Sequence, residues 1–298
     1  MAAFRDLFTT TASGRRLSPK GRAASVLALV MAFGLSLGAL NVPLASSAAH
    51  QIDVLHLADA AAPIDPRSEL WERAAELEVP LSAQQMQQPG GGTTRTVRVR
   101  AVEDGLSFAI RMSWEDPTRD DGQGLVPTDA AAIQLPIDPA VLPYQCMGQT
   151  NSRVNIWQWK ASLEVTDRSA IGALAEEGAG VRNLTSNGIC KAVDSPGLAP
   201  RVRSFHDGQM WHVVFARGIG KGNLTSAPIE PTLNTSAAFA VWNGTQGEVR
   251  GMKAVSTWNT MAFTAPEKSN AGDLIALGAV VLLSAAAVAF TMRRMAGS

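Results

Sequence analysis

Short stretches of alternating apolar and polar residues dominate the middle of the chain. In TRTVRVRAV, valines and an alanine alternate with arginines, and a similar two-residue period recurs in LSFAIRMSW. Such a period places the apolar side chains on one face of a β-strand. Glycine, proline, asparagine and aspartate separate these stretches, so the pattern predicts an antiparallel β-sandwich. Strands are expected at residues 94–102, 106–114, 153–165, 210–219, 236–244 and 253–263.

Helical patterns are few in this part of the chain. RSELWERAAELEV at 67–79 predicts one short helix, and RSAIGALAEEG at 168–178 predicts a second that ends at its glycine. The acidic segment 114–136 and the glycine-rich segment 84–94 are expected to be loops. The expected fold class is therefore mainly β, with a few short helices.

The first 49 residues have the layout of an export signal. Basic residues between positions 15 and 22 precede an apolar run at 23–40, and small residues at 47–49 then offer a signal-peptidase site. The apolar run is long for a signal peptide, so an uncleaved membrane anchor is the alternative interpretation.

The C-terminal end predicts a single transmembrane helix. Residues 274–292 form an uncharged apolar stretch close to the roughly 20 residues that cross a bilayer. Arg293 and Arg294 follow, and positive charge stays on the cytoplasmic side. A buried helix of a soluble protein is the alternative. The expected domains are an export signal at 1–49, an extracytoplasmic domain on the periplasmic side at 50–268, and a membrane anchor with a short cytoplasmic tail at 269–298.

Composition and motifs mainly exclude certain classes of function. The 298 residues are 46% hydrophobic and 17% charged with a formal net charge of zero, which fits a folded protein and gives no basic surface for nucleic acid. The sequence contains no Walker A, GxSxG or HExxH motif, and no CxxC pair for a zinc ribbon or an iron–sulfur cluster. In an exported protein the two cysteines, Cys146 and Cys190, can form a disulfide, and the sequence does not decide whether they do.

Two segments carry candidates for binding chemistry. Asp116, Asp120, Asp121 and Asp129 lie close together and would suit calcium, but they lack EF-hand spacing, and a solvated loop is the favoured interpretation. Met147, in PYQCMGQTNSRVNIWQWKA, is a soft thioether donor suited to iron or copper(I). From the residues alone, filling a gap in the core is its favoured role.

Five segments resemble a known family. MSWEDPTRD, TDAAAIQLP, PYQCMGQTNSRVNIWQWKA, WHVVFARGI and AFAVWNGTQGEVRGMKAVSTW are similar, in this order, to the haem-binding gamma subunit of ethylbenzene dehydrogenase. Its relatives serve other enzymes of the type II branch of the dimethyl sulfoxide reductase family. The resemblance covers about residues 79 to 265. It implies an antiparallel β-sandwich that holds one non-covalent haem b between a methionine and a lysine.

The resemblance implies a ligand for each side of the iron. Met147 matches the methionine, and Lys253 in RGMKAVSTW is the first choice for the lysine, with Lys221 in GIGKGN as the runner-up and His212 as the fallback. A lysine binds iron only as the neutral amine, so the pocket would have to hold its pKa well below the ordinary value of about 10.4.

Four further residues are expected around the haem. Trp157, in the strand that follows Met147, is expected to wall the pocket with its ring. Arg217, Arg250 and Trp258 are expected close to the haem, facing its propionates. No catalytic residue is expected, because two axial protein ligands leave no open position on the iron for a substrate.

The resemblance also implies partners. The expected role is a non-catalytic electron-transfer subunit that relays single electrons between the iron–sulfur subunit of a molybdenum oxidoreductase and another carrier, such as a cytochrome or a quinone-linked protein. The molybdenum catalytic subunit would act on the substrate. Alternatives from other classes are a haem-free module whose tryptophans stack on carbohydrate, and a structural membrane anchor of a complex.

Overall fold

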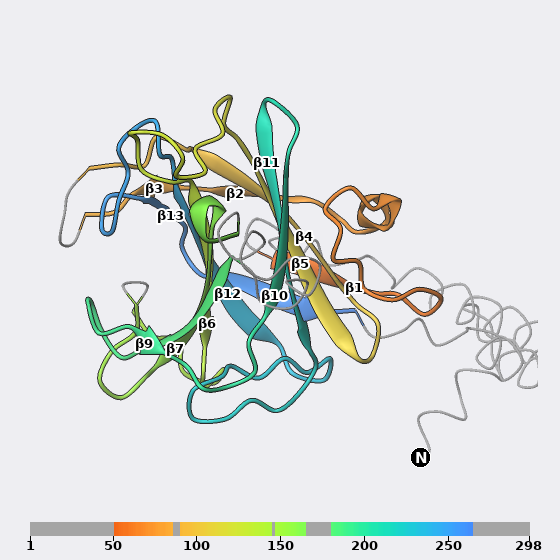
Figure 1. Ribbon diagram of the computed structural model, residues 1–298. Coiled ribbons are helices and arrows are strands. Elements are labelled where there is room, and N and C mark those ends of the chain that lie inside the picture. Colours follow the sequence, from red (N-terminus) through yellow and green to blue (C-terminus); the bar gives the residue numbers. More distant parts are fainter. Residues whose placement is uncertain (1–50, 86–89, 145–146, 165–179, 265–298) are drawn as a thin grey trace, which may run out of the picture. The chain divides into compact units, whose positions relative to one another are not determined.

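The computed structural model describes residues 51–85, 90–144, 147–164 and 180–264 (Figure 1). Their regular secondary structure is almost entirely strand, with one short 3-10 helix, η2 (Glu69–Arg73), and one helical turn at 161–164. The strands are β1 (Gln51–His56), β2 (Leu77–Pro80), β3 (Ser82–Ala83), β4 (Thr96–Glu103), β5 (Ser107–Glu115), β6 (Ala130–Pro136), β7 (Val154–Lys160), β8 (Val181–Ser186), β9 (Val193–Asp194), β10 (Arg201–His206), β11 (Met210–Gly218), β12 (Thr235–Trp242), β13 (Ala254–Val255) and β14 (Asn259–Phe263).

All fourteen strands belong to one hydrogen-bonded sheet. Its main path runs β10-β11-β5-β4-β1-β14-β12-β6-β7-β8-β9, while β2 pairs with β4, and β13 bridges β12 and β3. The pairs are antiparallel except for β1, which lies parallel to both β14 and β4. The prediction of a mainly β, mostly antiparallel protein is therefore confirmed.

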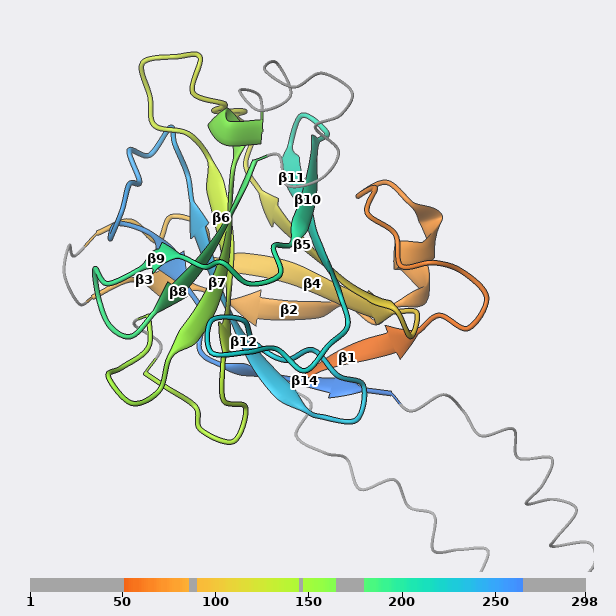
Figure 2. The same cartoon turned by 60° about the horizontal axis from the view of Figure 1, so that its bottom comes forward.

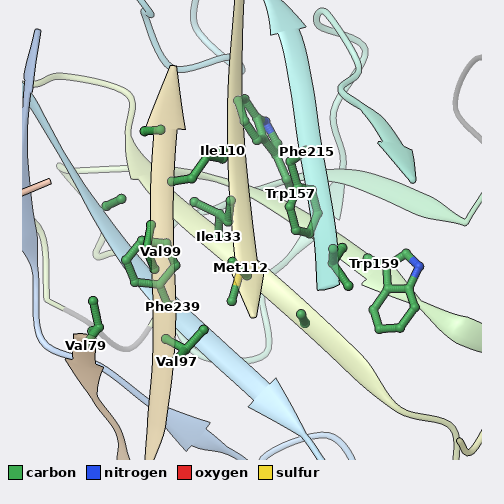
Figure 3. Packing of buried hydrophobic residues seen from close by; sticks show 14 of the residues in the cluster. Val79, Val97, Val99, Ile110, Met112, Ile133, Trp157, Trp159, Phe215 and Phe239 are labelled. Atoms are coloured by element: carbon green, nitrogen blue, oxygen red, sulfur yellow. The ribbon is translucent and has the colours of Figure 1, made fainter. Parts of the chain in front are cut away.

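The sheet folds over so that its two halves pack face to face (Figure 2). The ring of Trp159 on β7 lies 4.9 Å from that of Trp211 on β11 and 6.2 Å from that of Trp114 on β5, measured between centroids. Trp157 and Ile133 from one half join a single buried cluster with side chains of the other half (Figure 3). The large core between the halves gives this continuous sheet its sandwich character.

Most strand predictions agree with the structure, and the exceptions have local causes. The predicted strand at 153–165 ends at Lys160, where a helical turn over 161–164 begins. The predicted strand at 253–263 divides into β13 and β14. Between them, the N–H of Ser256 still donates to the carbonyl of Phe239 at 2.9 Å, but the N–H of Phe239 donates to the Ser256 hydroxyl at 2.9 Å instead of to its carbonyl, and the regular pairing ends there.

The helix predicted at 67–79 is wrong beyond its first turn. Ser68 caps η2 through a hydrogen bond from the N–H of Leu70, but the helix ends at Arg73. Leu77 and Val79 instead pair with β4, where Val79 is buried. A β-branched side chain with a partner strand outweighs a modest helical propensity here. The second predicted helix, 168–178, lies entirely outside the described residues and stays a prediction.

Strand β6 occupies part of the segment that was expected to be a loop. All seven of its residues, Ala130–Pro136, are buried, and it pairs with β12 on one side and β7 on the other. A strand buried on both faces shows a continuous apolar run instead of an alternation, so its two-residue period is weak.

Within the described ranges, no helix has the length and apolar character needed to cross a membrane. The predicted export signal and the predicted transmembrane helix fall on residues 1–50 and 265–298. Both lie outside the described residues and stay predictions.

Candidate functional site

A cavity of about 960 Å³ lies on the face of β12, β6, β7 and β8 that points away from the main core. Its size is at the upper end of the roughly 300–1,000 Å³ typical of ligand pockets. The four strands form its floor. Two walls rise from segments that are far apart in the sequence: residues 82–85 with 248–256, and Met147 with residues 189–192.

Alanines line the centre of this floor, so only short side chains project from it into the cavity. Ala238 and Ala240 on β12 and Ala130 and Ala132 on β6 all line the cavity, and Ala240 pairs directly with Ala132. An alanine side chain ends at Cβ, so adjacent alanines leave an open, apolar surface above the sheet. Larger apolar side chains stand around them, including Ile156.

Lys253 lies in the first wall, immediately before β13. Its backbone carbonyl accepts a hydrogen bond from the N–H of Gln84 at 3.0 Å, which joins the two segments of the wall. Its ammonium nitrogen lies 4.8 Å from the ring centre of Trp242. The indole N–H of Trp242 in turn donates to the carbonyl of Arg250 at 3.0 Å. The lysine is therefore held over an aromatic face inside the cavity.

A buried carboxylate fixes the loop that carries this wall. Glu248 is 2% exposed, and one of its oxygens accepts hydrogen bonds from the N–H and the hydroxyl of Thr93, at 2.9 and 2.8 Å. Its other oxygen accepts from the N–H of Asn243 at 3.1 Å. Because all three donors belong to the protein, Glu248 is a structural anchor at the margin of the cavity.

Met147 belongs to the second wall. Its carbonyl accepts a hydrogen bond from the N–H of Gly188 at 3.0 Å, which ties it to the turn between β8 and β9. The neighbouring Gly148 has a φ of +80°, and a Cβ there would lie 2.9 Å from the carbonyl oxygen of Ser186. Glycine is therefore required beside the methionine. The half-buried Met147 side chain packs against the apolar cluster that includes Ile156.

Backbone strain gathers at this cavity. Across the described ranges, three non-glycine residues have a positive φ: Met147 at 65°, Cys190 at 58° and Arg250 at 52°. All three line the cavity. Each such conformation costs on the order of 1–3 kcal/mol, persists only where the surroundings hold it, and is found preferentially at functional sites. The coincidence marks the cavity as the candidate site.

The structure places three of the six sequence-predicted site residues on the lining of one cavity. Met147, Lys253 and Arg250 line the one cavity. Trp258 packs against the apolar cluster below it, and its indole N–H donates to the carbonyl of Pro143, in the loop that leads to Met147, at 2.8 Å. Trp258 therefore supports the methionine wall from outside.

Trp157 and Arg217 lie elsewhere, which corrects the expectation that they face a ligand. Trp157 is fully buried in the main core, and its indole N–H donates to Asn155 at 3.0 Å. The guanidinium of Arg217 lies 5.1 Å from the Trp157 ring centre and donates to the carbonyl of Ala227 at 2.6 Å. Burial lowers the pKa of Arg217 to about 10. Strand alternation explains the placement, because residues 157 and 159 point to the core when 156, 158 and 160 point to the cavity.

The two alternative iron ligands do not line the cavity either. Lys221 follows β11 in an exposed loop. His212 lies on β11, in the other half of the sheet, where its ring nitrogens lie 2.9 Å from the hydroxyl of Ser113 and 3.2 Å from the carboxylate of Asp207. The histidine is thus engaged in local strand contacts.

Three polar residues of the cavity were not anticipated from the sequence. Gln158 and Lys160 on β7, and Arg182 on β8, all line it. The signal was present in VNIWQWK, where the tryptophans of a core-facing series alternate with Ile156, Gln158 and Lys160.

In the acidic segment, the buried carboxylate of Asp129 is held by three hydrogen bonds. The carboxylate of Asp129 accepts from the N–H of Asp120 at 2.8 Å, the N–H of Gly244 at 2.8 Å and the indole N–H of Trp211 at 2.9 Å. Burial raises the pKa of Asp129 to about 6. In the part of the chain that the structure describes, no group of three or more histidine, cysteine, aspartate or glutamate side chains is arranged to hold a metal ion. Cys146 lies outside the described residues, so its disulfide with Cys190 stays a prediction.

Sequence comparisons match the chain to one family model and to subunits of oxidoreductases. Residues 68–183 match a family model described as ethylbenzene dehydrogenase. A Haloferax mediterranei protein, provisionally assigned as a respiratory nitrate reductase haem subunit, is 29% identical over 81% of this chain and 84% of its own length. The gamma subunit of chlorate reductase from Ideonella dechloratans is 26% identical over 66% and 79%. The gamma subunit of dimethylsulfide dehydrogenase from Rhodovulum sulfidophilum is 25% identical over 65% and 72%.

Proposed function

We propose that the chain is a member of the family of haem-binding gamma subunits that accompany molybdenum oxidoreductases of the ethylbenzene dehydrogenase type, and that it is a non-catalytic electron-transfer subunit with one haem b in the alanine-floored cavity. Related chains are named as the haem subunit of a nitrate reductase and as gamma subunits of chlorate reductase and dimethylsulfide dehydrogenase, which supports an electron-transfer role. When bound, the haem iron would gain and lose one electron at a time.

The observation that carries the proposal is the presence of both Met147 and Lys253 on the lining of one cavity. A thioether and a neutral amine are suitable axial donors for iron, and Lys253 would bind in its deprotonated form. The two residues come from different walls, 106 positions apart in the sequence.

Strand register supports opposite approaches by the two donors. Met147 is tied to Gly188, just beyond Ser186, and Ser186 pairs with Val154 at the start of β7. Lys253 precedes Ala254, which pairs with Val241 close to the other end of the floor. The alanines lie between these ends. This placement at the two ends of one floor supports the proposal that Met147 and Lys253 would both hold the iron.

We further propose the partners of this subunit. Electrons would pass between the iron–sulfur subunit of a molybdenum oxidoreductase and a cytochrome or quinone-linked carrier. The predicted transmembrane helix at 274–292 would hold the domain at the membrane on the periplasmic side, which favours a membrane-bound partner over a diffusing one. The substrate would be handled by the separate molybdenum subunit.

The proposal is tested by the spectrum of the full chain reconstituted with haem. We expect reduced-minus-oxidised bands of a b-type cytochrome and a six-coordinate, low-spin iron. Met147→Leu keeps the side-chain volume but removes the sulfur, and Lys253→Ala removes the amine. Each variant should give a five-coordinate, high-spin spectrum.

Lys221→Ala is the matched control, because Lys221 does not line the cavity. Its spectrum should stay six-coordinate and low-spin. The ligand assignment fails if Lys253→Ala keeps the low-spin spectrum while Lys221→Ala loses it. The proposed function fails if the wild-type chain gives no b-type bands.

A further inference from the structure

The cavity has an excess of positive charge. Among the described residues that line it, Lys160, Arg182, Arg250 and Lys253 are basic, whereas Glu248 is the single acidic one. Both oxygens of Glu248 already accept hydrogen bonds from Thr93 and Asn243. A concave site lined mainly by one sign of charge favours a ligand of the opposite sign.

Two of the cations share one edge of the floor. Gln158 pairs with Arg182 across β7 and β8, and Lys160 follows two residues later on the same face of β7. Burial, and then the charge of Arg182, lower the pKa of Lys160. Lys160 and Arg182 therefore lie close enough together for the charge of one to act on the other.

Both cations are available to a ligand. No hydrogen bond or ion pair engages the Lys160 ammonium or the Gln158 amide within the described ranges. Arg182 donates to Asp194 at 2.9 Å, but the two side chains are 47% and 77% exposed, so the pair is weak and easily exchanged. A guanidinium carries five N–H donors, so it can bind a second carboxylate while the first remains.

We propose that Lys160, Gln158 and Arg182 form a carboxylate-binding subsite at the β7–β8 edge of the cavity. This inference rests on the proposed function, and with haem b the carboxylates are the two propionates. Charge-assisted hydrogen bonds from lysine and arginine are among the strongest that a carboxylate makes. The subsite fixes which edge of the ring lies beside β7 and β8, and it leaves Lys253 to the iron.

The experiment compares two porphyrins with the full chain. Iron protoporphyrin IX carries both carboxylates, and its dimethyl ester carries none. Wild-type protein should bind the free acid at least about tenfold more tightly than the diester, since each charge-assisted contact is worth a factor of about that size. The double variant Lys160→Met/Arg182→Gln should lose this preference. Its affinity for the diester and its low-spin spectrum should stay unchanged.

Lys221→Met is the control for the loss of one positive charge away from the cavity, and it should keep the preference. The inference is overturned if the double variant discriminates between the two porphyrins as strongly as wild type. It is also overturned if the double variant loses affinity for both porphyrins equally, because the residues would then act through the fold. If wild type binds neither porphyrin with a low-spin spectrum, the proposed function fails as well.

Discussion

The two faces of β6, β7 and β12 are built from the same strands and serve different ends. On the core face, Ile133, Trp157 and Phe239 are 0–2% exposed and pack into the main cluster. On the opposite face, Ala132, the polar Gln158 and Ala240 line a cavity of about 960 Å³. Alternate residues of one strand therefore have two separate roles: one set packs the core, and the other lines the cavity.

This difference shows how the sheet can be stable and still leave space. The large core side chains bury apolar surface on one side, which stabilises the strand pairing at about 25 cal/mol for each Å² removed from water. The small and polar residues on the other side contribute little burial and are free to shape a site. Substitutions on the two faces should accordingly affect different measurements.

The largest effect is expected from removing a core tryptophan. Trp157→Ala should lower the free energy of unfolding by about 3–5 kcal/mol, the usual cost of a large aromatic cavity in a core. Urea unfolding followed by far-ultraviolet circular dichroism measures it. Its neighbour Gln158→Ala, on the cavity face, should change stability by no more than about 0.5 kcal/mol. Equal losses for the two variants would contradict the division between the faces.

A smaller effect is expected from enlarging alanines. Ala131→Phe places a ring in the packed core, where Ala131 is 0% exposed, and should destabilise the fold by about 1–3 kcal/mol. Ala240→Phe places the same ring in the cavity and should leave stability nearly unchanged while it prevents haem binding. Urea unfolding and haem titration of both variants separate the two outcomes. A destabilised Ala240→Phe chain would show that the cavity face is packed.

The third effect depends on pH and concerns Asp129, which lies at the edge of the core. Its pKa rises from 3.8 to about 6 on folding. Between these values the folded chain keeps a proton that the unfolded chain releases, so this group makes the free energy of unfolding fall as pH rises through the window, and its contribution is constant above about 6.

The variant Asp129→Asn isolates that contribution. The stability of wild type minus that of the variant should decrease between pH 4 and pH 6, and unfolding curves at several pH values measure it. A difference that is constant across this range would mean that the three N–H donors to Asp129 offset the effect of burial.

The smallest effect is expected at the rim of the cavity. Asp194 pairs with Arg182 while 77% exposed, so Asp194→Asn should change the free energy of unfolding by less than about 1 kcal/mol. If Arg182 binds a ligand carboxylate, the same variant should bind iron protoporphyrin IX slightly more tightly, because a competing carboxylate is removed. Weaker binding would mean that Asp194 positions the arginine.

The sequence predicted the strands in which one face carries polar residues and the other carries apolar residues. The alternation in β4 and β5 is visible as VRVRAV and SFAIRMSW, and both strands form close to their expected bounds. β6 was missed because it is buried on both faces. The helix expected at 67–79 failed because Leu77 and Val79 find a partner in β4, and that contact is not visible in a local pattern.

The candidate site was predictable only in part. Family resemblance placed Met147 and Lys253, whose shared cavity depends on pairings between distant segments that no local period reveals. The resemblance did not place Trp157, although the alternation in VNIWQWK already set it on the face opposite Gln158. Conspicuous aromatic residues suggested a binding role, whereas burial in the core explains them fully.

The parallel pairing of β1 has a consequence for the order of assembly. β1 lies between β4 and β14, and Gln51 pairs with Thr260 across more than two hundred residues of chain. During synthesis β1 can complete its pairing only at the end, because its partner β14 is translated after every other strand. The two halves of the sheet join through β14, so they can pack face to face around the main core only after the last strand has been made.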